Sequence, residues 1–136
     1  MNRTNSRPVR KSAAISQIQA LVKECAEPGW DGDGAEPVSQ SAASLAVDHI
    51  RALPDSVALP EFAPEPDGSI SLDWIQSRSR LFSLSAGPSC RLAYAWLDGE
   101  DRGHAVACFD GATVPWRILE EIRGIMNDAN APVGAV

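Results

Sequence analysis

The residues best suited to chemistry lie in one short glycine-rich loop, residues 30–37, whose sequence is WDGDGAEP. Its three carboxylates, Asp31, Asp33 and Glu36, would suit a cation or a substrate site. An EF-hand loop that began at Asp31 would need an oxygen ligand at its fifth position and a glutamate at its twelfth, but the fifth residue is Ala35 and the twelfth is another alanine. A phosphate-cradling loop would need a lysine, which this loop lacks. We expect its glycines to form left-handed turns and its aspartates to bond local backbone N–H groups.

The histidines and cysteines show no catalytic or metal-binding spacing. His49, His104, Cys25, Cys90 and Cys108 form neither a C-x-x-C nor an H-x-x-x-H pattern. No G-x-S-x-G element surrounds a nucleophilic serine. We expect His49 to lie near a helix surface and Cys108 to be a small buried residue in a strand. The sequence therefore predicts no metal, no cofactor and no catalytic residue.

Tryptophan accounts for four of the eight aromatic residues. Trp74 and Trp96 fall in strand-like alternating segments, where core packing is expected. Trp30 lies in the loop and Trp116 at the start of the last expected helix, so both are predicted to be partly exposed. Because tryptophan is enriched at interface hot spots, we take Trp30, Trp116 and the three loop carboxylates as candidate partner-binding residues.

Charge is distributed unevenly along the chain. The net charge is -6, yet Arg3, Arg7, Arg10 and Lys11 lie in the first eleven residues, which contain no acid. Subtracting this +4 from -6 leaves about -10 on the other 125 residues. An acidic body repels nucleic-acid phosphates, so only the basic arm is a candidate for contacting an anion or a nucleic acid.

The chain contains no apolar run of the roughly 18 residues that a membrane-spanning helix needs, and no apolar region follows its basic start. Its three cysteines are odd in number and far apart, which is typical of reduced thiols. We therefore expect a cytoplasmic protein without a membrane partner.

Helical periodicity occurs in three places. Apolar residues recur at three- and four-residue steps from Ser12 to the Pro28 stop, and again from Ser39 or Ser41 to about Leu53. The third helix follows Thr113 or Val114, with a proline in its first turn and its apolar stripe beginning at Trp116. Residues 54–67 contain four prolines and are expected to form an extended crossover.

From Gly68 the period of the apolar residues changes from 3.6 to 2, which indicates strands. Four strands are expected, within residues 70–76, 81–84, 91–97 and 104–109. The third carries apolar residues on both faces and is therefore expected to be interior. Short connections imply antiparallel neighbours, and the helices need a sheet face to cover. The predicted fold is a two-layer α+β domain with three helices and a four-stranded meander, in the order α-α-β-β-β-β-α. It spans residues 12–127, between a flexible basic arm (1–11) and a flexible tail (128–136).

Two segments resemble a pattern found in small uncharacterised bacterial proteins of similar size. The pattern is W-D-G-x-G-A-x-P, here residues 30–37, then a helix and a proline-rich crossover, and then D-G-x-I-x-L-x-W, here residues 67–74. The resemblance covers most of residues 12–126. It implies no assigned activity and no catalytic residue. Such proteins often look like partner-binding accessory factors of mobile or defence-related operons.

These observations favour a non-enzymatic, acidic interaction protein, similar to an antitoxin, an immunity protein or a defence accessory factor, that binds a basic surface on a protein partner. Two alternatives remain open. The protein could be a nucleic-acid-linked regulator that uses the basic arm, or a small enzyme or metal-binding protein at the loop Trp30–Glu36. A homodimer is compatible with each of them, because an open sheet leaves two edges.

Overall fold

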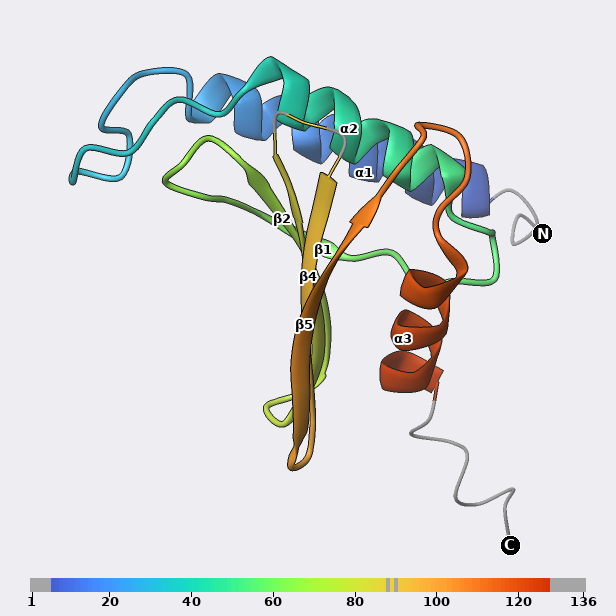
Figure 1. The fold of residues 1–136 in the computed structure, drawn as a ribbon. Coiled ribbons are helices and arrows are strands. Elements are labelled where there is room, and N and C mark those ends of the chain that lie inside the picture. Colours follow the sequence, from blue (N-terminus) through green and yellow to red (C-terminus); the bar gives the residue numbers. More distant parts are fainter. Residues whose placement is uncertain (1–5, 88, 90, 128–136) are drawn as a thin grey trace, which may run out of the picture.

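The computed structural model describes residues 6–87, 89 and 91–127 (Figure 1). Two helices precede a run of five strands, and a third helix follows it. The elements are α1 (Ser6–Glu24), α2 (Gln40–Ala52), β1 (Glu61–Pro64), β2 (Ile70–Ser77), β3 (Arg80–Ala86), β4 (Arg91–Asp98), β5 (Asp101–Cys108) and α3 (Trp116–Asn127). The α+β class, the three helices and the antiparallel meander are thus confirmed.

The sheet has five strands in the order β1-β2-β3-β4-β5, all antiparallel, so the predicted count of four is wrong. The missed strand is β1, in which Glu61 pairs with Asp73 and Pro64 with Ile70. A proline lacks a backbone N–H, but it is tolerated where that position faces away from the ladder, at the edge of a sheet. The proline-rich crossover therefore ends in an edge strand. As expected, β4 is an interior strand, between β3 and β5.

One face of the sheet forms the core and the other stays open. Alternate residues of β2, β3 and β4 are buried beneath the helices: Ile70, Leu72, Trp74, Phe82, Leu84, Ala86, Leu92 and Tyr94. Helices α2 and α3 both pack on β2 and β3, whereas α1 packs on α2 and along β1. Figure 1 shows α3 beside the sheet and α1 with α2 across one end of it. The opposite face, termed here the open face, has no helix over it in the described chain.

The first helix begins at Ser6, six residues before the predicted start at Ser12. Residues 6–11 are therefore helical, which contradicts a flexible arm over that part of 1–11. Pro8 lies in the first turn, where a missing backbone N–H removes no intrahelical bond. Residues 1–5 and the predicted tail 128–136 lie outside the described residues.

The second helix begins as predicted, because Ser39 caps it. The Ser39 side chain accepts a hydrogen bond from the backbone N–H of Ala42 at 3.1 Å. The third helix buries Ile118, Ile122 and Ile125 against the sheet. Trp116, predicted to begin the apolar stripe of this helix, does not lie on the buried face, since it is 64% exposed.

Candidate functional site

The loop that carries the candidate carboxylates is held by its own hydrogen bonds. Asp31 Oδ1 accepts from the backbone N–H groups of Asp33 at 2.8 Å and Ala35 at 3.1 Å. The N–H of Gly29 donates to the carbonyl of Ala35 at 2.7 Å. The two loop glycines, Gly32 and Gly34, and the preceding Gly29 all have positive φ, between 76° and 82°. The predicted aspartate and glycine roles are thus confirmed for Asp31 and for the glycines, and the Asp31 carboxylate is occupied by the backbone of its own loop.

Trp30 braces this loop from the inside. Its indole Nε1–H donates to the carbonyl of Glu36 at 2.7 Å, and its ring is half-buried against the core. The carboxylates of Asp33 and Glu36 are exposed. Within the described residues, neither carboxylate has a hydrogen bond or an ion pair. The loop therefore presents two unengaged carboxylates on a fixed backbone.

The two segments that carry the sequence resemblance lie against each other. The N–H of Glu36 donates to the carbonyl of Pro66 at 2.8 Å, and that of Ser39 donates to the carbonyl of Gly68 at 2.9 Å. Gly68 has a φ of +91°, and a Cβ there would lie 3.0 Å from the carbonyl oxygen of Pro37. The short turn at Asp67 and Gly68, before β2, therefore packs directly against the end of the loop.

This contact concentrates negative charge at one end of the molecule. Residues 24–38 and 61–73 contain nine carboxylates and no lysine or arginine. Their exposed members nearest the contact define what we call the acidic end: Glu27, Asp31, Asp33, Glu36 and Asp67. Figure 1 shows the loop and the β1–β2 turn projecting side by side from the same end. The loop carboxylates were predicted as candidates; Glu27, just before the loop in the sequence, was not predicted, and Asp67 joins them only through the fold.

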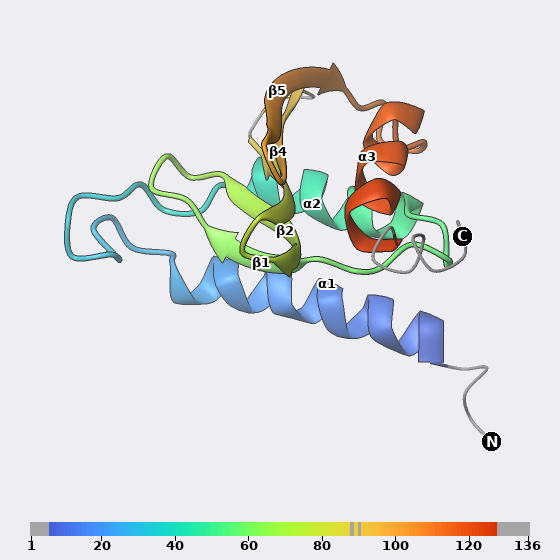
Figure 2. The same cartoon turned by 90° about the horizontal axis from the view of Figure 1, so that it is seen from below.

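Trp116, the remaining candidate for partner binding, is not part of this end. It begins α3, which lies across the molecule from the loop in Figures 1 and 2. The Arg117 guanidinium lies 5.5 Å from the centroid of the Trp116 ring. The five candidate residues are therefore split between the acidic end and an isolated exposed indole.

The basic arm is also divided. Lys11 Nζ donates to the carbonyl oxygens of Leu53 at 2.5 Å and Arg51 at 3.3 Å, and it lies 3.6 Å from Asp55 Oδ1. Lys11 thus holds the carboxyl end of α2. Of the other arm residues, Arg10 is exposed, Arg7 lies in the first turn of α1, and Arg3 is outside the described residues.

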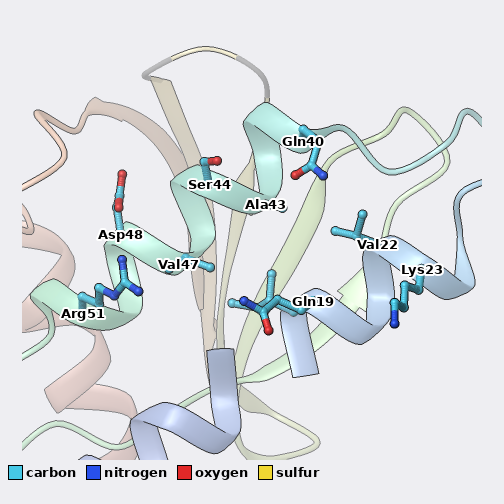
Figure 3. Close-up of a pocket in the computed structure, with 10 residues that line it drawn as sticks. Gln19, Val22, Lys23, Gln40, Ala43, Ser44, Val47, Asp48 and Arg51 are labelled. Carbon is cyan, nitrogen blue, oxygen red and sulfur yellow. The ribbon is translucent and has the colours of Figure 1, made fainter. Parts of the chain in front are cut away.

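A groove between α1 and α2 was not predicted. It has a volume of about 400 Å³, and Figure 3 shows its residues on the two facing helices. Val22 and Val47 line it together with the polar side chains of Gln19, Gln40 and Ser44. The sequence gives little indication of this groove, because the groove exists only where α1 and α2 lie side by side, and a long loop separates these helices in the chain.

The open face carries a polar cluster that the sequence analysis also missed. Asp73 accepts hydrogen bonds from the hydroxyls of Ser71, at 2.6 Å, and Ser83. The Ser85 hydroxyl donates to Glu65 Oε1 at 2.5 Å. Pairing of β2 with β3 places these serines side by side, so each carboxylate is satisfied by neighbouring hydroxyls.

Two expectations, one about His49 and one about the thiol of Cys108, are wrong. His49 is fully buried, not near the helix surface, and lies edge-on to the rings of Trp74 and Phe109. Neither of its ring nitrogens has a hydrogen-bond partner in the described part of the chain. Desolvation by burial lowers the pKa of His49 to about 4. Cys108 is exposed, not buried, whereas Cys25 is buried.

Among residues 6–87, 89 and 91–127, no group of three or more His, Cys, Asp or Glu side chains is placed to hold a metal ion. The same residues include no helix that is both long and apolar enough to cross a bilayer. A scan against protein-family models and searches of curated proteins and of solved structures found no match to this chain.

Proposed function

We propose that this chain is a non-catalytic binding protein whose acidic end docks onto a basic surface of a protein partner. The observation that carries the proposal is the meeting of two segments that contain no lysine or arginine and that bring five exposed carboxylates to one end of the molecule: Glu27, Asp31, Asp33, Glu36 and Asp67. Opposite charge on a partner would accelerate encounter and select the orientation of docking. We also propose a cytoplasmic location, which suits the buried thiol of Cys25.

The backbone of the acidic end supports this function because it is already ordered. Asp31 holds the loop from within, Trp30 ties it to Glu36, and the Glu36 N–H ties it to the β1–β2 turn. A partner would therefore not have to order a flexible loop when it binds, which lowers the entropic cost of association. The exposed carboxylates of Glu27, Asp33 and Glu36 are available for ion pairs, because they make none within the described chain.

The test compares three versions of the full chain as baits in extracts of the organism that encodes it. The first is the wild type. The second reverses the three available charges of the acidic end, Glu27→Lys, Asp33→Lys and Glu36→Lys. The third is a matched control that reverses three exposed charges elsewhere: Glu100→Lys, Asp101→Lys and Glu120→Lys.

We expect a stoichiometric partner on the wild type and on the control, but not on the acidic-end variant. Added salt should release this partner, because Debye screening weakens exposed ion pairs. Retention of the same proteins by all three baits, or the absence of a stoichiometric partner on the wild type, would contradict the proposal.

A further inference from the structure

The two edges of the sheet are protected to different degrees. At one edge, α1 packs along β1, and β1 contains Pro64 and begins with Glu61 (Figure 2). At the other edge, β5 is eight residues long, and no strand in the described chain pairs with its outer side. Its only Lys, Arg, Asp or Glu residues are Asp101 and Arg102 at its start, and residues 103–108 contain no proline. Natural sheets usually protect such an edge with charges, prolines or a covering element, so β5 is suited to accept another strand.

The register identifies which groups β5 offers. Asp98 and Asp101 pair across a two-residue turn and exchange backbone hydrogen bonds. Every second residue from there, namely Asp101, Gly103, Ala105 and Ala107, therefore directs its backbone N–H and C=O groups toward β4. The residues between them, Arg102, His104 and Val106, direct their N–H and C=O groups outward. The same three residues lie on the open face, where Val106 is 53% exposed.

We infer that β5 pairs with β5 of a second copy of this chain, antiparallel about a two-fold axis at His104. Arg102 of each copy then lies opposite Val106 of the other, and the outward groups of these three positions form reciprocal backbone hydrogen bonds. Because the charged end of each strand lies opposite the uncharged end of its partner, no Asp or Arg meets a like charge. Parallel pairing would place Asp101 on Asp101 and Arg102 on Arg102, which is unfavourable.

A second copy also fits the shape of the molecule. The pairing would join two five-stranded sheets into one continuous sheet and bring their open faces side by side, with Val106 of each copy next to the Arg102 side chain of the other. It is a closed two-fold assembly, the commonest symmetry among soluble oligomers. The acidic ends adjoin β1, at the opposite edge of each sheet, and stay exposed in the dimer. The inference is therefore independent of the function proposed above.

The first test measures the mass of the full chain in solution by sedimentation over a range of concentrations. The wild type should reach twice the 14.5 kDa chain mass. Val106→Pro removes an outward N–H from an edge strand and no bond to β4, so we expect the dimer dissociation constant to rise about tenfold or more. Val106→Thr, which keeps the β-branched shape and the N–H, is the matched control and should stay dimeric. Circular dichroism checks that each variant is folded.

The second test uses His104, the one residue of β5 that lies opposite itself in the antiparallel pair. His104→Lys and His104→Glu each place like charges across the axis, so each variant alone should be more monomeric than the wild type. An equimolar mixture of the two variants should form heterodimers, in which the lysine of one copy faces the glutamate of the other, detectable by native mass spectrometry. A wild type that stays monomeric at all concentrations would overturn the inference. Dimers that persist unchanged in Val106→Pro and in both charged variants would overturn it as well.

Discussion

The indole ring of Trp96 in β4 lies over Gly103, its antiparallel partner in β5, so closely that a Cβ at position 103 would come within 2.4 Å of Trp96 Cζ2. Only a residue without a side chain leaves room for this ring. The pair fixes the tip of the β4–β5 hairpin, and the side chain of one strand packs on the backbone of the next.

Gly103→Ala should therefore destabilise the protein, because the methyl group must displace a large ring. We expect a loss of about 1–3 kcal/mol in the free energy of unfolding, measured by urea titration. Gly124→Ala is the control: it lies in α3, with open space around the added Cβ among the described residues, and should raise stability by up to about 1 kcal/mol. Equal stability of Gly103→Ala and the wild type would show that the ring moves freely.

The buried His49 should make stability depend on pH. Its folded-state pKa of about 4 lies below the ordinary 6.5, so the unfolded state binds the proton more readily. This contribution is complete above pH 6.5 and is lost as the pH falls toward 4, by about 3 kcal/mol in total. His49→Leu should remove this component and leave the pH dependence of the carboxylates. Urea titrations of both proteins from pH 7 to 4.5 measure the difference, and parallel curves would contradict the prediction.

Lys11 should contribute to stability, although its place in a basic sequence predicted an anion-contacting role. Lys11→Met removes a charge-assisted bond to the Leu53 carbonyl at the end of α2, and we expect it to cost about 1–2 kcal/mol. The exposed Lys23, in the last turn of α1, provides the control, and Lys23→Met should change stability by less than about 0.5 kcal/mol. Thermal or urea unfolding distinguishes the two, and equal effects would contradict a capping role.

The two aspartates of the loop should differ in their structural effect. Asp31→Ala leaves two backbone N–H groups without their acceptor and should cost about 1–2 kcal/mol. Asp33→Ala should be within about 0.5 kcal/mol of the wild type. The indole N–H resonance of Trp30 should shift only in Asp31→Ala, because Trp30 bonds to the far side of this loop. A shift of similar size in both variants would refute the distinction.

The regular elements of this fold could be predicted wherever their pattern was strong. The alternation of Ile70, Leu72 and Trp74 marked β2, and Ser39 marked the start of α2. Strand β1 was missed because prolines argue against a strand. Proline is tolerated in an edge strand, but the sequence alone does not show that this segment lies at the edge of the sheet.

His49 is a residue whose polarity obscures its place in the helical pattern. It follows Ala46 by three residues and precedes Leu53 by four, so it lies on the buried stripe of α2. Its polarity argued for the surface, and the aromatic rings that enclose it come from β2 and from the segment after β5. The acidic end was predicted only in part for a similar reason, because Asp67 reaches the loop through pairing between distant segments.

The contact of Lys11 with Leu53 spans 42 residues, whereas every strand of the sheet pairs with a neighbour in the chain. During synthesis, α1 leaves the ribosome before α2 and β1 exist, so its apolar side has no native partner at first. The hairpins need only short loop closures and should assemble quickly once translated. We expect the docking of α1 to complete folding, which makes a nascent chain stalled before residue 53 the form most exposed to chaperones.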